Sequence, residues 1–196
     1  MRHQRVLAAA AVALGLVLTG CGDATDGSNG STSATTKDFN KTDVAFAQQM
    51  IPHHRQAVEM AELAETRASQ AKVKQLAVKI EGAQAPEIKT MTGWLKDWDQ
   101  KNSGMSHEGS DHEGKDHGDM GGMMSAEDMA RLKGLTGAAF DREFLTMMIG
   151  HHSGAIEMAR MEQSHGKNDQ AVDLATAIET AQAKEIKTMR ALLEDR

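Results

Sequence analysis

Two adjacent histidines occur twice in the chain, and each pair follows a methionine by about one helical turn. His53 and His54 lie in the stretch MIPHHRQAVEMAE, and His151 and His152 lie in MIGHHSGAIEMAR, 98 residues later. Imidazole and thioether groups are ligands for soft metal ions, and the single cysteine, Cys21, lies outside both stretches. Neighbouring residues on a helix diverge by about 100°, so one histidine of each pair can face the bundle axis and the other a neighbouring helix. The doubled phrase predicts a metal site made of histidine and methionine.

A second repeated stretch supplies further polar groups. AQAPEIKTM places Gln84, Glu87 and Met91 on one helical face, and AQAKEIKTM does the same for Gln182, Glu185 and Met189. A carboxylate in an apolar row is unusual without a partner, and helical bundles build metal sites from side chains on facing helices. The predicted metal ligands of the bundle are Met50, His53, His54, Glu87, Met91, Met148, His151, His152, Glu185 and Met189.

Structural roles for these residues stay open beside the metal role. A single buried histidine is more often hydrogen-bonded within a core, and a row of methionines more often packs there. We expect Met60, Met158 and Met161 to pack in the core. For Glu59 and Glu157 we expect salt bridges or outer contacts to the ligands.

The loop over 101–124 joins the two copies and carries regularly spaced histidines. Histidines recur there every five residues beside Glu, Gly and Asp, with methionines between them, which favours metal capture over a plain solvated linker. Deleting the loop is expected to lower metal capacity and to leave the fold intact. The stretch Ser125–Asp128 is a capping box that restarts helix. The predicted loop ligands are His107, His112, His117, Met105, Met120, Met123 and Met124.

The elements that hold these residues are predicted to be helices. Residues 43–98 and 141–196 align without a gap, and 24 of 56 positions are identical. Each copy is rich in helix formers, with apolar residues at three- and four-residue steps and a polar break near residues 67–69 or 165–168. Two such hairpins bury their apolar faces by packing together. The fold class is therefore predicted as all-α, with a four-helix bundle over residues 38–196.

The N-terminus predicts export and a lipid anchor. Residues 1–20 combine a basic start with an apolar run, which is typical of a secretory signal, and LTGC resembles a bacterial lipobox. The resemblance implies a lipidated Cys21, followed by a flexible tether over residues 21–37. The expected location is the extracytoplasmic face of the cell membrane. Without the signal, 20 basic residues face 28 acidic ones, a net charge of −8, which argues against nucleic acid as a partner.

Methionine and histidine without thiolate favour copper as the metal. Cu(I) suits this donor set best, and Cu(II) and Ag(I) are alternatives. Binding is expected to weaken as the pH falls through about 6.5, because neutral imidazole is the form that binds metal. A ferritin-like di-metal oxidase is an alternative, but only Glu162 and His165 have the Glu-x-x-His spacing that it needs. A non-metal lipoprotein that docks a partner protein is the other alternative.

The doubled MIPHHRQAVEMA and MIGHHSGAIEMA stretches, each followed by EIKTM, resemble the domain of unknown function 305 family. The resemblance covers about residues 38–196. It implies a ferritin-like helical bundle, an extracytoplasmic location and, for some members, copper binding in metal tolerance. We therefore expect a lipid-anchored, non-enzymatic protein that buffers or sequesters copper, or hands it to a copper-transport partner. The ligands implied by motif position are Met50, His53, His54, Met148, His151 and His152.

Overall fold

Four long helices and one short helix make up the described part of the chain. The computed structural model describes residues 38–102 and 121–195, and within these ranges it contains no strand, so the all-α prediction is confirmed. The breaks inside the two repeats fall at residues 68–70 and 166–168, close to where they were predicted. In chain order the helices are α1 (Lys41–Arg67), α2 (Ala71–Asp97), α3 (Ala126–Gly134), α4 (Gly137–His165) and α5 (Asp169–Glu194).

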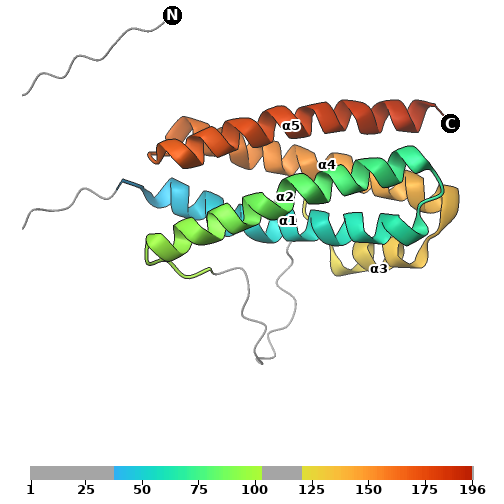
Figure 1. Cartoon of the computed structure of the whole chain (residues 1–196), viewed down its shortest axis with the longest axis horizontal. Coiled ribbons are helices and arrows are strands. Elements are labelled where there is room, and N and C mark those ends of the chain that lie inside the picture. Colours follow the sequence, from blue (N-terminus) through green and yellow to red (C-terminus); the bar gives the residue numbers. More distant parts are fainter. Residues whose placement is uncertain (1–37, 103–120, 196) are drawn as a thin grey trace, which may run out of the picture. The chain divides into compact units, whose positions relative to one another are not determined.

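The two repeats form two helical hairpins that meet through α1 and α4. Helix α1 packs along α2, helix α4 packs along α5, and α1 also contacts α4, whereas α2 and α5 touch little. One core cluster joins the first half of α1 to the second half of α4, and the other cluster joins the remaining halves. Helices α1 and α4 therefore run antiparallel and cross near their middles (Figure 1). The hairpins are related by an approximate two-fold axis at this crossing, while a ferritin-like topology remains a prediction.

Two buried aspartates fasten each hairpin to the turn of the other. The Asp43 carboxylate accepts hydrogen bonds from the backbone N–H groups of Lys167 and Asn168, both at 2.9 Å. Its equivalent in the second repeat, Asp141, accepts from the backbone N–H of Ser69 at 3.0 Å. Each carboxylate satisfies backbone donors that a helix start leaves without partners. The same aspartate-to-turn hydrogen bonding thus joins the two hairpins at both ends of the bundle.

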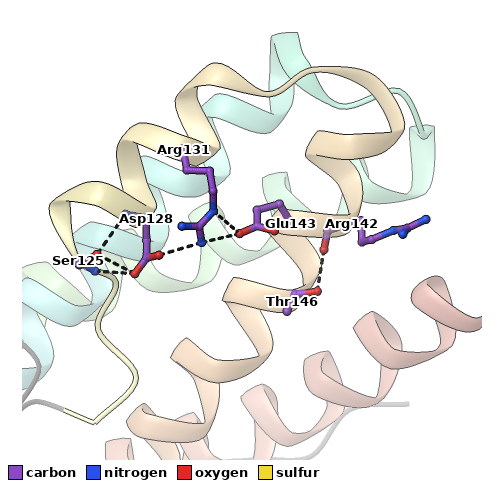
Figure 2. Close-up of polar contacts among 6 residues, drawn as sticks. All are labelled: Ser125, Asp128, Arg131, Arg142, Glu143 and Thr146. Carbon is purple, nitrogen blue, oxygen red and sulfur yellow. Dashed lines mark hydrogen bonds and ion pairs between the residues drawn. The ribbon is translucent and has the colours of Figure 1, made fainter.

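Helix α3 is an addition to the predicted four helices. It begins at the predicted capping box, in which the Ser125 side chain accepts from the Asp128 N–H and the Asp128 side chain reaches back to Ser125. Arg131 joins α3 to α4 through an ion pair with Glu143 at 2.7 Å, and it also pairs with Asp128 at 2.8 Å (Figure 2). Leu132 of α3 is fully buried in the core. Helix α3 is therefore a packed part of the bundle.

Both ends of the predicted loop are fastened to α1. The Gln48 side chain donates to the Lys101 carbonyl at 2.8 Å. The Gln56 side chain forms two hydrogen bonds to Met124, one to the carbonyl at 2.9 Å and one from the N–H at 2.7 Å. Deleting all of 101–124 would remove these contacts, so a deletion that spares the fold must be confined to residues 103–120. The predicted ligands His107, His112, His117, Met105 and Met120 lie outside the described residues, as does Cys21.

None of the helices within residues 38–102 and 121–195 combines the length and the apolar character needed to cross a membrane.

Candidate metal centre

A layer of polar side chains divides the core of the bundle at the crossing of α1 and α4. The two apolar clusters lie on either side of this layer. Burying polar groups costs free energy unless they find partners, so a polar layer at the centre of a small bundle needs a reason. We call it the histidine layer, and it consists of His53, His54, Gln84, Glu87, His151, His152, Gln182 and Glu185.

The rings of His53 and His151 contact each other at a tilt in the centre of this layer. Their ring centroids are 3.7 Å apart with an angle of 38° between the planes. The two side chains come from α1 and α4, and only 0% and 1% of their surface is exposed. None of their four ring nitrogens has a hydrogen-bond partner at good geometry among the described residues. Because an unpartnered buried polar group costs about 1–3 kcal/mol, this inner pair is unfavourable for stability alone.

Burial keeps both inner histidines neutral. Desolvation, followed by the charge of His54, lowers the pKa of His53 from 6.5 to about 3. Desolvation also lowers the pKa of His151 well below 6.5, with His53 as the next cause. The backbone of Gly121 approaches the His53 ring, and the backbone of His53 approaches the His151 ring. Each partly opposes the lowering of the pKa without completing a hydrogen bond to the ring. For this pair, protons are therefore expected to compete with metal at a lower pH than the predicted value near 6.5, because the pKa of each ring lies below that value.

His54 and His152 differ from the inner pair because each has a carboxylate partner. The Nε2 atom of His54 lies 2.6 Å from Oε2 of Glu87, and Nε2 of His152 lies 2.6 Å from Oε2 of Glu185. In the neutral ring, Nε2–H donates a hydrogen bond to the carboxylate, which leaves Nδ1 with its lone pair. Both Nδ1 atoms are buried without a hydrogen-bond partner in the described part of the chain. The outer pair thus has an oriented ring and one nitrogen available as a ligand.

The four predicted methionine ligands lie in the core beside the histidine layer. Met50, Met91, Met148 and Met189 are all fully buried. Met50 and Met91 belong to one apolar cluster, and Met148 and Met189 belong to the other. Each methionine is about one helical turn from a histidine or glutamate of the layer, so the structure brings one pair of thioethers to each side of it.

Two glutamines of the layer were missing from the predicted ligands. Gln84 and Gln182 are buried, and no hydrogen-bond partner is found among the described residues for either polar atom of Gln84 or for Oε1 of Gln182. Each precedes a layer glutamate by three residues and so lies on the same helical face. The sequence places both glutamines on this face, as the structure does, but they were not included among the predicted ligands.

The donors of the layer suit a soft ion of low coordination number. Among the residues that the structure describes, no three His, Cys, Asp or Glu side chains are grouped to hold a metal. The two imidazoles in contact, and the buried methionines about one helical turn from the layer residues, offer nitrogen and sulfur donors. Such a set fits Cu(I) or Ag(I) better than the hard, oxygen-binding ions. The unpartnered ring nitrogens are the observation that a metal would explain.

The chain matches a family model and several solved structures. The family described as "Domain of unknown function (DUF305)" matches residues 43–193. A DUF305 fragment from Deinococcus radiodurans superposes with a TM-score of 0.69 at 30% identity, covering 80% of this chain and 98% of that one. A DUF305 protein from Streptomyces coelicolor, classed as a candidate secreted protein, has a TM-score of 0.69 at 29% identity, covering 79% and 93%.

A further similar structure contains copper. The protein CopM, solved in a Cu(II)-bound form, superposes with a TM-score of 0.64 at 33% identity, covering 78% of this chain and 96% of that one. CopM has also been solved in Cu(I)-bound, Ag-bound and apo forms. No match was found among curated proteins.

Proposed function

Because the chain belongs to the DUF305 family, whose solved structures include CopM with copper or silver bound, we propose that it binds copper at the histidine layer. The observation that carries the proposal is the contact between His53 and His151, whose buried ring nitrogens have no hydrogen-bond partner among the described residues. A metal ion bound to these nitrogens would replace the missing hydrogen bonds. The protein would then buffer or sequester copper, or hand it to a transport partner.

The inner and outer histidines have different roles in the proposed site. His53 and His151 are the first ligands, because burial keeps both neutral. Glu87 and Glu185 hold the outer rings in the tautomer that offers Nδ1 to the layer. The buried thioethers complete a donor set without thiolate, which supports Cu(I) as the favoured ion over Cu(II) and Ag(I).

A binding role is better supported than a di-metal oxidase. An oxidase of that kind needs carboxylates shared between two metals. Here each layer glutamate is hydrogen-bonded to its own histidine. Glu162, which has the Glu-x-x-His spacing, lies beside Asp43 at the end of the bundle instead of in the layer. We therefore propose a non-enzymatic role.

The location of the protein is part of the proposal. The candidate secreted relative and the predicted signal support an extracytoplasmic position. We propose that Cys21, which lies outside the described residues, carries the lipid anchor. Mass spectrometry of the protein from cell membranes tests this: a diacylated N-terminal Cys21 is expected, and a soluble, unmodified chain would contradict it.

Competition with a Cu(I) chelator under reducing conditions tests the metal site. The full chain should retain Cu(I) in preference to Zn(II). The His53→Leu/His151→Leu variant should lose the tightest site, whereas the matched variant His165→Leu, which changes an exposed histidine at the end of α4, should keep it. If wild-type protein retains no copper, or if the double variant binds as tightly as wild type, the proposed site is wrong.

A further inference from the structure

The two halves of the contact between α1 and α4 are equivalent by the repeat, but only one of them is covered by α3. On the covered half, Lys133 of α3 forms an ion pair with Glu59 at 2.6 Å. Met129 and Leu132 of α3 are buried there, and Met60 of α1 is fully buried in the same cluster. The salt bridge expected for Glu59 and the packing expected for Met60 are both confirmed.

The other half of this contact is an open groove of about 340 Å³. Its walls are the first half of α1 and the second half of α4, and its lining includes Gln49, Gly121, Glu157, Met158 and Met161. No described helix lies over it as α3 lies over its counterpart.

The groove exposes a thioether that the covered half does not, together with a carboxylate that lacks the ion pair of its counterpart within the described residues. Met161 is 59% exposed, so the expectation that it packs in the core is wrong. Met158, the repeat equivalent of the buried Met60, is partly exposed. Glu157 is the equivalent of Glu59, yet it forms no salt bridge within the described residues. Two thioethers beside an unpaired carboxylate attract a soft monovalent cation and offer little to Zn(II) or Mg(II).

The groove also adjoins the inner histidines through one backbone segment. Gly121 lines the groove, and its backbone approaches His53. The Gly121 carbonyl lies so close to Gly154 of α4 that a Cβ atom there would come within 1.6 Å of it. Gly122 has a φ of +84° and is pressed onto the Gly150 carbonyl, which a Cβ would approach at 2.6 Å. The segment at Gly121 and Gly122 thus lies between the groove and the inner histidines.

We propose that this groove is a second metal site, in which Met158, Met161 and Glu157 receive Cu(I) before it passes to His53 and His151. The inference rests on the proposed function, because it gives the histidine layer its route of supply. The thioethers bind the ion weakly at the surface, and the buried imidazoles hold it more tightly. Helix α3 blocks the equivalent route on the other side, so supply is one-sided.

The test uses the full chain labelled with ¹³C at the methionine methyl groups. Ag(I), which is redox-inert, is titrated in while the methyl signals are followed by NMR. The signals of Met158 and Met161 should shift once the added Ag(I) exceeds what the histidine layer holds, and the signal of Met60 should not shift at that stage. The inference is overturned if the Met158 and Met161 signals stay in place when Ag(I) is added beyond the filling of the histidine layer.

Kinetics supply the second arm of the test. The Met158→Leu/Met161→Leu variant keeps the apolar volume and should acquire Cu(I) from a chelator several-fold more slowly than wild type, with the same final occupancy of the layer. The matched variant Met60→Leu should acquire it at the wild-type rate. Equal rates for all three proteins would overturn the route. A wild-type protein that takes up Ag(I) at Met158 and Met161 but retains no copper would sink the proposed function and the transfer step, and leave the groove as a metal site.

Discussion

At the residue scale, the four histidines are two chemically different pairs. The inner rings of His53 and His151 touch each other and lack hydrogen-bond partners among the described residues, whereas the outer rings are each bonded to a glutamate. Removing a buried polar group that has no partner relieves a cost, and removing one that has a partner leaves that partner stranded. The same substitution should therefore have opposite effects on the two pairs.

We predict that replacing the inner pair with apolar residues keeps or raises the stability of the apo protein and removes copper binding. His53→Leu/His151→Leu should leave the free energy of unfolding of the apo protein unchanged or higher, because apolar side chains suit this position. His54→Ala should lower it by about 1–3 kcal/mol, because Glu87 loses its partner. Denaturant unfolding of the apo proteins measures both effects. A large loss of stability in the double variant would show that the inner pair is there for packing.

The lowered pKa of His53 gives the apo protein a defined response to acid. The folded state keeps this ring neutral down to about pH 3, whereas the unfolded chain takes up a proton near pH 6.5. Between these values the unfolded state binds more protons, so this ring makes stability fall as the pH falls below about 6.5. His151 acts in the same direction. Between about pH 7 and pH 4, the free energy of unfolding should fall less steeply in His53→Leu/His151→Leu than in wild type. Equal slopes for the two proteins would contradict the lowered pKa values of these rings.

At the element scale, α4 carries two glycines whose surroundings differ. A Cβ atom at Gly150 would meet nothing within 4 Å, whereas one at Gly154 would collide with the Gly121 carbonyl. Gly150 therefore only weakens the helix, and Gly154 makes room for the chain that crosses it. This contrast gives a matched pair of variants one turn apart.

We predict opposite signs for alanine at these two positions. Gly150→Ala should raise the free energy of unfolding by about 0.5–1 kcal/mol, because alanine is the better helix former. Gly154→Ala should lower it by about 1–3 kcal/mol, because the segment at Gly121 must move away. Hydrogen exchange of the Met124 amide, which Gln56 holds in the wild type, should also become faster in Gly154→Ala. Equal stability of the two variants would mean that the segment does not pack on α4.

At the scale of the whole molecule, the two ends of the bundle are equivalent by the repeat, but they differ in their ionisable residues. Glu162 is fully buried beside Asp43, and its repeat equivalent next to Asp141 is Ala64. Burial, followed by the neighbouring Asp43 carboxylate, raises the pKa of Glu162 to about 8. Asp43 stays ionised, because its hydrogen bonds lower its pKa despite burial. One end of the bundle therefore titrates near neutral pH.

This end should make stability fall as the pH rises. Between pH 4.5 and about 8 the folded protein holds a proton on Glu162 that the unfolded chain has released, so stability decreases across this window. Glu162→Gln should remove this decrease of the free energy of unfolding with pH. Glu157→Gln, which changes an exposed residue, should leave the decrease in place. Both variants retain the histidines, so the difference between their unfolding profiles isolates Glu162. A Glu162→Gln profile that follows wild type would refute the raised pKa.

Repetition explains how much of this molecule the sequence predicts. Periodicity predicts the four long helices, and the ungapped repeat predicts that equivalent histidines meet near one axis, as His53 and His151 do. Which histidine faces inward depends on how α1 crosses α4, and helix periodicity does not determine that. The exposure of Met161 and the pairing of Glu162 were also missed, because they arise where the copies diverge and where α3 covers only one side.

Lys101 and Met124 are both hydrogen-bonded to α1, so the packing of the bundle does not depend on the length of the chain between them. Their partners, Gln48 and Gln56, are eight residues apart on α1, which places the two attachment points about 12 Å from each other. The bundle closes at these points, so the chain between them only has to span that short distance. Doubling its length would cost about 0.6 kcal/mol of loop-closure entropy. We therefore expect insertions and deletions between these two attachment points to be tolerated in evolution while the histidine layer is preserved.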